Sequence, residues 1–393
     1  MKNLYFLKDK IPIVKLDNKK GENMQRSFIR EILDITNDKS ISFAGGLPDI
    51  SKFPNKKLQK IASKVFEDKN LLQYSSSLGF YPLREKIAQF YNNEGFKTSP
   101  KNIMITSGSQ QALDIISRYY KNKSITIESP SYLGAMNIFN LNNIKQSSVI
   151  LNDDGIDLDG FKRSLKKTKL AYLIPDYQNP TGKTYTQKNR KNIANIVKKH
   201  NALIIEDTPY KELYFDKKHK SISQDLPKNS YILGSFSKIL APSFRIGWIR
   251  AHQSLLNPLI SYKEIMDLHT NNLSQYILNE YLKNDKENKK YLKGLREFYL
   301  NKRDIFCDIL DKDLSQFEYK KPKGGMFIYG KIKNIDTKEL VKKSIKKDVY
   351  FVPGIEFYNN KSTTDEIRFN FTNASKKEVS KGLKTIAKIL EDF

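Results

Sequence analysis

Short apolar runs alternate with stretches of helical spacing from about residue 100 to residue 240, and this rhythm constrains the fold most. The runs and the stretches that follow them are 103–105 with 109–120, 125–127 with 132–141, and 170–174 with 187–200, and further runs lie at 202–205 and 231–233. Continuous apolar strands separated by helices are typical of a mostly parallel sheet that is covered on both faces. In such α/β sheets, ligands bind at the carboxyl ends of the strands.

The chain has 393 residues, which is too long for one simple core. The region after residue 290 begins with a long charged helix pattern and continues with separated strands, which predicts a smaller α+β domain. The first 58 residues contain a helical pattern at 24–35 and a Gly/Pro turn region at 42–49, and they precede the parallel rhythm. We therefore expect an N-terminal arm and part of the small domain at 1–58, a large domain at 59–289 and a C-terminal small domain at 290–393.

The net charge of +26 is unusual for a metabolic enzyme. Because the lysines come mainly as scattered doublets, we interpret the charge as a generally basic solvated surface, with an anion-attracting functional face as the alternative. One cysteine, Cys307, and four histidines leave few zinc ligands, so no metal is expected, and the Cys307 neighbours predict a buried inert thiol. The N-terminus does not resemble a signal peptide, and no apolar stretch is long enough to span a membrane, so we expect a cytoplasmic protein that does not bind membranes.

Polar motifs follow the predicted strands. The segment SFSK ends at Lys238 and contains Ser235 and Ser237, with Arg245 seven residues later. A lysine at a strand end can serve as a nucleophilic amine when its surroundings lower its pKa, and an arginine with hydroxyls can bind phosphate. A solvated lysine is the alternative interpretation.

Three upstream segments fit the same picture. SGSQQALD, at 107–114, is a Gly-containing turn that opens a helix, where free N–H groups favour phosphate, although an ordinary cap at Ser109 is the alternative. Asn179 precedes a proline after a strand and is either a ligand donor or a simple turn residue. Asp207 ends a buried strand and needs a partner, either a ligand cation or a neighbouring arginine or helix N-terminus, and Tyr210 lies within reach of the same place.

In their order along the chain, the segments resemble the class I/II aminotransferases, which are fold type I enzymes dependent on pyridoxal 5′-phosphate (PLP). The resemblance extends from about Phe28 to the C-terminus. Further segments, SFAGGLPD, LQYSSSLG, SPSYLGA and KPKGGMF, are similar to the branch of 2-aminoadipate, kynurenine and aromatic aminotransferases. The family implies an α/β large domain with a mostly parallel sheet, a smaller α+β domain, and transfer of an amino group from an L-amino acid to a 2-oxo acid such as 2-oxoglutarate by a ping-pong mechanism.

The resemblance also implies roles for individual residues. Lys238 would carry PLP as a Schiff base and move the substrate proton, and Asp207 would pair with the pyridine nitrogen. The remaining implied cofactor contacts are Asn179 and Tyr210 at the ring oxygen, Tyr132 on the ring face, and Ser109, Gln110, Ser235, Ser237 and Arg245 at the phosphate. Tyr74 would reach the phosphate of the neighbouring subunit, which implies a homodimer with shared active sites.

Substrate contacts are implied for Arg368, Asn179, Gly46 and Arg30. Arg368 would bind the α-carboxylate, and the strand pattern of EIRFNFT independently places it opposite the apolar face of Ile367 and Phe369. An exposed strand arginine is the alternative. Gly46 would allow the substrate to approach closely, and Arg30 would meet a distal carboxylate or be an unremarkable helix arginine.

Two rival functions remain open at this stage. A PLP-dependent lyase would use the same scaffold, because the fold alone does not define the reaction. Some transcription regulators join a DNA-binding domain to an aminotransferase-like domain, but fewer than 30 residues precede the first matched helix here, so we expect no nucleic-acid partner.

Overall fold

A computed structural model describes residues 28–37, 39–359 and 365–393. Its largest sheet has eight strands in the order β2-β9-β8-β7-β6-β3-β4-β5. These strands are β2 (Ile103–Thr106), β3 (Ser124–Ser129), β4 (Lys145–Asn152), β5 (Gly155–Ile156), β6 (Leu170–Leu173), β7 (Leu203–Asp207), β8 (Ser230–Ser235) and β9 (Gly247–Ala251). The five strands from β8 to β4 run parallel, whereas β9 is antiparallel to both β8 and β2, so the prediction of a mostly parallel sheet is confirmed.

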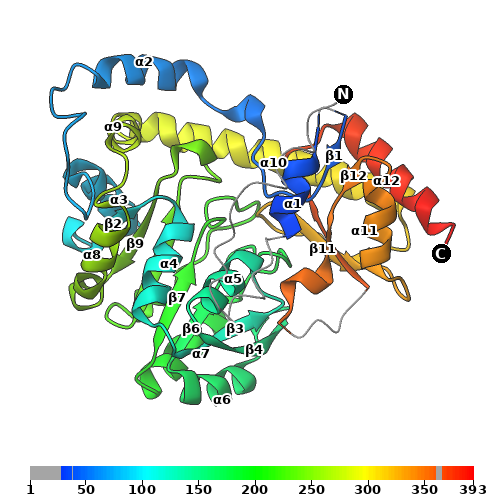
Figure 1. The fold of residues 1–393 in the computed structure, drawn as a ribbon, viewed down its shortest axis with the longest axis horizontal. Coiled ribbons are helices and arrows are strands. Elements are labelled where there is room, and N and C mark those ends of the chain that lie inside the picture. Colours follow the sequence, from blue (N-terminus) through cyan, green and yellow to red (C-terminus); the bar gives the residue numbers. More distant parts are fainter. Residues whose placement is uncertain (1–27, 38, 360–364) are drawn as a thin grey trace, which may run out of the picture.

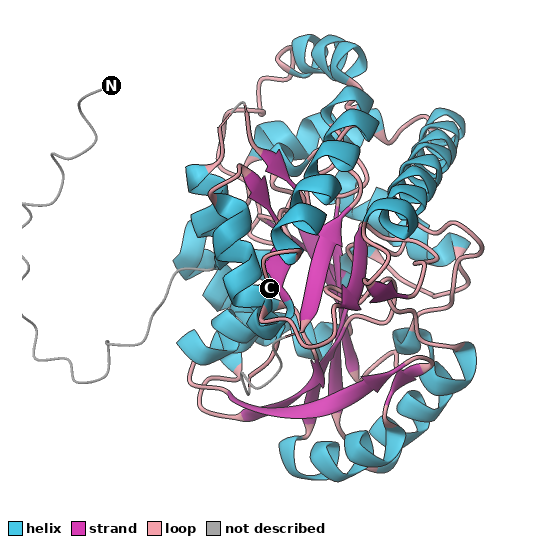
Figure 2. Cartoon of the chain, turned by 90° about the vertical axis from the view of Figure 1, so that its right-hand side faces the viewer, coloured by secondary structure: helices cyan, strands magenta, loops and turns pink. Residues whose placement is uncertain are grey.

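Helices cover both faces of this sheet (Figures 1 and 2). Residues that alternate along a strand point to opposite faces of the sheet. Met104 and Tyr172 pack with the core of α4 and α5, whereas Ile105 and Leu173 point to the opposite face. The helices of this part of the chain are α2 (Asn55–Val65), α3 (Tyr81–Asn93), α4 (Ser109–Tyr119), α5 (Leu133–Leu141), α6 (Leu158–Thr168), α7 (Gln187–Lys199), α8 (Gln253–Asp267) and α9 (Asn272–Tyr281).

The long helix α10 (Asp285–Asp313) runs from this helical layer to a second group of elements on the right of Figure 1. That group contains an antiparallel four-stranded sheet in the order β10-β11-β14-β13. Its elements are β10 (Glu318–Tyr319), β11 (Phe327–Lys331), α11 (Thr337–Ile345), β12 (Val349–Tyr350), β13 (Val352–Pro353), β14 (Glu366–Asn370) and α12 (Lys376–Leu390). The N-terminal strand β1 (Ile41–Ser42) pairs with β12, and helix α1 (Phe28–Ile35) lies beside them, so the two ends of the described chain meet (Figure 1).

Several local predictions are confirmed with small shifts of their bounds. The helix expected at 109–120 spans 109–119, and the one expected at 187–200 spans 187–199. Cys307 is a buried free thiol, as expected. Within the described residues, no helix is long and apolar enough to cross a membrane, and no group of His, Cys, Asp or Glu could hold a metal ion.

Candidate active site

Lys238 lies just beyond the carboxyl end of β8 and faces the loop that follows β1. Its Nζ donates a hydrogen bond of 2.6 Å to the carbonyl oxygen of Gly46. A Cβ atom at Gly46 would come within 3.0 Å of the Phe327 ring and 3.7 Å of the lysine Nζ. A larger residue at this position would therefore crowd the space in front of the amine.

Asp207 is the last residue of β7 and is only 4% exposed. Its Oδ2 accepts a hydrogen bond of 2.8 Å from the Tyr172 hydroxyl, whereas its Oδ1 is buried and has no hydrogen-bond partner among the described residues. Burial raises the pKa of the Asp207 carboxyl to about 7, although the bond from Tyr172 opposes the shift. A positively charged N–H donor at Oδ1 would satisfy this carboxylate, and no arginine of the described residues contacts this atom.

Asn179 connects two groups of residues in the region around Lys238, Asp207 and Arg368, which we call the cleft. Its Nδ2 donates to the Tyr210 hydroxyl at 3.5 Å, and its Oδ1 accepts a 2.7 Å hydrogen bond from Nη1 of Arg368. Burial raises the pKa of the Tyr210 hydroxyl above its usual value, so this group stays protonated and can donate a hydrogen bond.

Arg368 reaches the cleft from β14. Its Nη2 donates to the carbonyl oxygen of Ala44, and its guanidinium lies 4.3 Å from the ring centre of Phe327 and 4.9 Å from that of Phe357. The side chain is 1% exposed, and its Nε has no hydrogen-bond partner within the described part of the chain. Burial lowers the pKa of Arg368 to about 10. The alternative of an exposed strand arginine is therefore wrong, because both faces of β14 are buried here.

Hydroxyls, a guanidinium and a helix N-terminus converge near Lys238. Helix α4 begins at Ser109 after Gly108, whose φ of 82° is in the glycine-favouring region, and no side chain in the described part of the protein caps this helix. Arg245 donates from Nη2 to the carbonyl of Ser107 at 3.1 Å and from Nη1 to the Ser237 hydroxyl at 3.5 Å. The Ser235 hydroxyl donates to that of Ser237 at 2.9 Å. The interpretation of Ser109 as an ordinary cap is wrong, and the free N–H groups favour an anion.

Tyr132 and Gln110 lie next to the group formed by Ser235, Ser237, Arg245 and the start of α4, which we call the phosphate cradle. The Tyr132 hydroxyl donates to Oε1 of Gln110 at 3.2 Å, which links the residue before α5 to the first turn of α4. Tyr74 is not part of this cluster. Tyr74 is 78% exposed and its recorded ring contact is with His269, and the Arg30 side chain lies outside the described residues.

Two polar contributions were missed by the sequence reasoning. Tyr172 holds Asp207, and its signal was a hydroxyl inside an apolar strand, where it needs a partner. Lys302 on α10 forms an ion pair of 2.5 Å with Asp49 and donates to the carbonyls of Thr372, Asn373 and Ala374, which ties the Gly46 loop to the region after β14. Nothing local distinguishes Lys302 from the other lysines of α10.

The donor set fits PLP on grounds of this structure alone. The buried Oδ1 of Asp207 matches a protonated pyridine nitrogen, the uncapped start of α4 with Arg245 matches a phosphate, and the Lys238 amine matches an aldehyde. These three groups lie at the ends of neighbouring elements β7, α4 and β8, where ligands bind in α/β sheets.

Comparison with known proteins agrees with this geometry. Residues 41–386 match the family model of aminotransferase class I and II. The chain is 35% identical to aromatic-amino-acid aminotransferase 1 of Thermococcus litoralis over 98% of each chain, and 32% identical to 2-aminoadipate transaminase of Thermus thermophilus over 94% of each. The structure of kynurenine aminotransferase from Pyrococcus horikoshii, with 34% identity, superposes with a TM-score of 0.88 over 95% of this chain and 96% of that one. These matches show that the chain belongs to the class I and II aminotransferases and is a PLP-dependent enzyme.

Proposed function

We propose that this aminotransferase moves the amino group of an L-amino acid to 2-oxoglutarate in a ping-pong reaction. The observation that carries the proposal is the position of Asn179, which contacts Tyr210 on one side and Arg368 on the other. A cofactor ring held at Tyr210 and a carboxylate held at Arg368 would thus share one hydrogen-bonded frame. A buried arginine with an unused Nε is suited to a substrate carboxylate, because arginine binds carboxylates through a fork of donors.

We assign the following roles within that frame. When bound, PLP supplies an electron sink that makes the Cα proton of an amino acid acidic. The Nζ of Lys238 takes this proton and returns it, and the Oδ1 of Asp207 keeps a proton on the ring nitrogen. Tyr210 and Asn179 donate to the ring oxygen, and Tyr132 covers the ring face. The phosphate is held by Ser109, Gln110, Ser235, Ser237 and Arg245.

The donor class that we propose is 2-aminoadipate, kynurenine, an aromatic amino acid or a similar L-amino acid. Relatives at 32–35% identity carry the names of aromatic-amino-acid and 2-aminoadipate aminotransferases. Gly46 leaves room for the substrate, and Arg30 would meet a distal carboxylate if the donor has one.

We further propose a cytoplasmic homodimer whose active sites share Tyr74. Two segments expose large apolar side chains: Leu72 and Tyr74 belong to the first, and Ile265 belongs to the second. The two segments are neighbours, because Ser77 donates to Glu264 at 3.2 Å and the ring of Tyr74 contacts that of His269. A contiguous exposed apolar patch favours a protein interface. Analytical ultracentrifugation would show a monomer if this proposal is wrong.

The test of function is an absorbance titration of the PLP-loaded enzyme with single L-amino acids in the absence of an oxo acid. We expect some amino acids to convert the visible cofactor band and to release their 2-oxo acids, and 2-oxoglutarate to restore the band. The Lys238→Ala variant should lose turnover, whereas Lys167→Ala, which alters an exposed lysine of α6, should not. Release of ammonia or CO₂ without an acceptor would instead establish a lyase.

A further inference from the structure

A cavity lies beside β8, and Ile232, Gly234 and Ser235 of that strand line it. Its volume is about 250 Å³, and it is bounded by the end of α3, the segment after β7, the end of α9 and the first turns of α10. Aromatic side chains supply much of its wall: Phe90, Tyr91, Phe236, Trp248, Tyr281 and Tyr291. We call it the aromatic cavity. Lys238, Asn179 and Arg368 do not line it, although Ser235 of the proposed phosphate-binding residues does.

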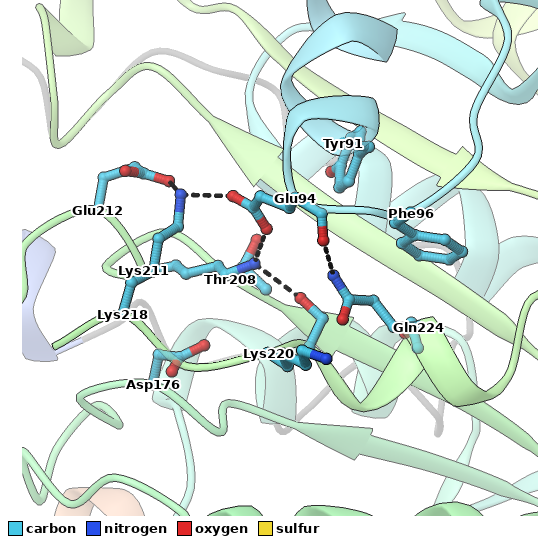
Figure 3. Close-up of polar contacts among 12 residues, drawn as sticks. Tyr91, Glu94, Phe96, Asp176, Thr208, Lys211, Glu212, Lys218, Lys220 and Gln224 are labelled. Atoms are coloured by element: carbon cyan, nitrogen blue, oxygen red, sulfur yellow. Dashed lines mark hydrogen bonds and ion pairs between the residues drawn. The ribbon is translucent and has the colours of Figure 1, made fainter. Parts of the chain in front are cut away.

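Two lysines and two glutamates line one end of the aromatic cavity, and Figure 3 shows their contacts with one another. Lys211 lies 2.6 Å from Glu94 and 2.9 Å from the Ser221 hydroxyl, and Lys218 forms ion pairs with both Glu94 and Glu212. Two ammonium groups thus face two carboxylates. Burial disfavours the charged form of Glu94, but the two lysines outweigh it and hold the pKa of that carboxyl below its usual value. With its charges paired, this end of the cavity favours an uncharged occupant over an ion.

Two polar atoms at the wall have unused hydrogen-bonding capacity. Asn288 lines the cavity from α10, and its Oδ1 is buried without a partner among the described residues. The Tyr91 hydroxyl accepts a 2.8 Å bond from the Trp248 indole, and within the described ranges no acceptor is recorded for its own proton. Buried polar atoms are normally satisfied, so an unused acceptor in a cavity indicates a place for a donor.

We propose that the aromatic cavity binds an uncharged aromatic molecule that carries one O–H or N–H donor. A ring stacks well among aromatic walls, and its donor would satisfy Oδ1 of Asn288. The size is adequate, since an apolar cavity of about 150 Å³ binds benzene. Apolar walls with a few placed polar groups, at the junction of a long connecting helix with a sheet, are typical of small-molecule sites.

The cavity shares two wall residues with the strand ends of the candidate active site. Thr208 follows Asp207, and Ser235 belongs to the proposed phosphate cradle. An occupant would therefore contact the ends of β7 and β8, the two strands whose ends lead to Asp207 and Lys238. No active-site residue needs to change for the site to be tested.

Trp248 makes occupancy measurable, because it is the single tryptophan of the chain and lines the cavity. The probe is 4-iodophenol at neutral pH, which is uncharged, carries one O–H donor and quenches tryptophan emission through its iodine atom. We expect saturable quenching of Trp248 in the PLP-loaded enzyme. The absence of saturable quenching up to the solubility limit of the probe would overturn the proposal.

Variants at Asn288 separate this site from other places where a ring could bind. Asn288→Leu removes the acceptor and should weaken binding roughly tenfold. Asn288→Phe places a ring in the cavity and should abolish saturable quenching. Lys286→Met, on the same helix but outside the cavity wall, should bind as the unchanged enzyme does. All three should keep their basal turnover and melting temperature within a few degrees.

Two outcomes would contradict the assignment. If 4-iodophenol quenched all variants alike and competed with the amino-acid substrate, the probe would be bound in the active-site cleft and the proposal would fail. If Asn288→Phe alone lost quenching while Asn288→Leu bound at full affinity, the cavity would be occupied without the proposed hydrogen bond, and the requirement for a donor would be wrong.

Discussion

Two buried carboxylates show how differently the same burial can be used. Glu128 lies against the segment 175–190, and we call the buried groups around this segment the wall. Glu128 in the wall and Asp207 in the cleft both have a pKa that burial raises to about 7. The oxygens of Glu128 accept hydrogen bonds from the Ile174 N–H, the Tyr185 hydroxyl and the Gln178 amide. Asp207 has the Tyr172 bond at one oxygen and nothing recorded at the other.

Two buried arginines repeat the contrast. Arg190 and Arg368 are each 1% exposed. Arg190 pairs with Asp176 at 2.6 Å, and all three of its nitrogens donate, to Asp176 and to backbone carbonyls. Arg368 keeps an Nε without a partner in the described chain.

The comparison teaches that burial alone does not identify a site. Buried charged groups are normally satisfied, and those of the wall are complete without any ligand. Those of the cleft have one unused atom each, and the missing partners match a ring nitrogen and a substrate carboxylate. Substitutions in the wall should therefore act on stability, and substitutions in the cleft should act on catalysis.

The largest effect is expected for Arg190→Met in the wall. The change leaves the carboxylate of Asp176 buried without its partner, so the free energy of unfolding should fall by about 3–5 kcal/mol. Chemical denaturation measures it, and turnover per folded molecule should stay within about tenfold of normal. Adding Asp176→Asn should restore part of the stability. A large loss of turnover at normal stability would break the comparison.

Asp207→Asn in the cleft should lower turnover of the PLP-loaded enzyme by on the order of 10²–10³, because it removes the charge that keeps the ring nitrogen protonated. In the cofactor-free protein, the same substitution should increase stability. The folded pKa of Asp207 is about 7 against an ordinary 3.8, so between these values the folded chain retains a proton that the unfolded chain has released. Its contribution to stability therefore falls as pH rises through this window.

At pH 8, Asp207→Asn should thus make the cofactor-free protein more stable by about 2–4 kcal/mol, with the difference vanishing near pH 4. Thermal denaturation across this range measures the difference. If stability depended on pH equally in the two proteins, burial would not disfavour the charged form of Asp207 in the folded chain.

Arg368→Lys should raise KM for the amino acid by about tenfold to a hundredfold, because lysine lacks the fork of donors that binds a carboxylate. The visible spectrum of the bound cofactor should be unchanged, since Arg368 lies on the substrate side. Steady-state kinetics with both substrates is the measurement. A loss of PLP affinity with a normal KM would place Arg368 on the cofactor side instead.

The smallest effect is expected for Glu128→Gln. The new amide group would face the donor of Gln178 or of Tyr185, so one hydrogen bond is lost and the free energy of unfolding should fall by about 1–2 kcal/mol. Tyr185→Phe, which removes one donor and leaves the carboxylate, is the matched control. A greater loss of turnover than in Asp207→Asn would reverse the contrast between wall and cleft.

Much of the fold followed from the sequence because apolar runs and helical spacing are local signals. The positions of α4, α7, β6 and β8 were predicted closely for that reason. The antiparallel strand β9 was missed, since GWIRA has no feature that reveals its direction or its place between β2 and β8. Strand direction depends on long-range pairing.

The same distinction holds for the site. Residues in motifs at strand ends, such as Asp207 and Lys238, could be proposed from the sequence because they directly follow predicted strands, and the structure places them there. Partners contributed by another strand or helix were not: Tyr172 comes from β6 and Lys302 from α10. Nor does composition reveal the aromatic cavity, whose wall combines segments from residue 90 to residue 292.

The contact between Arg368 and the carbonyl of Ala44 joins residues 324 positions apart. The residues proposed to hold the cofactor phosphate lie between 109 and 245 and are all synthesised before Arg368. At roughly 5–20 residues per second, a ribosome completes the phosphate cradle on the order of 10 s before it adds the arginine. The residues proposed to bind the cofactor are thus synthesised well before the arginine that is proposed to bind the substrate, so a chain that stops short of β14 would carry the first set without the second.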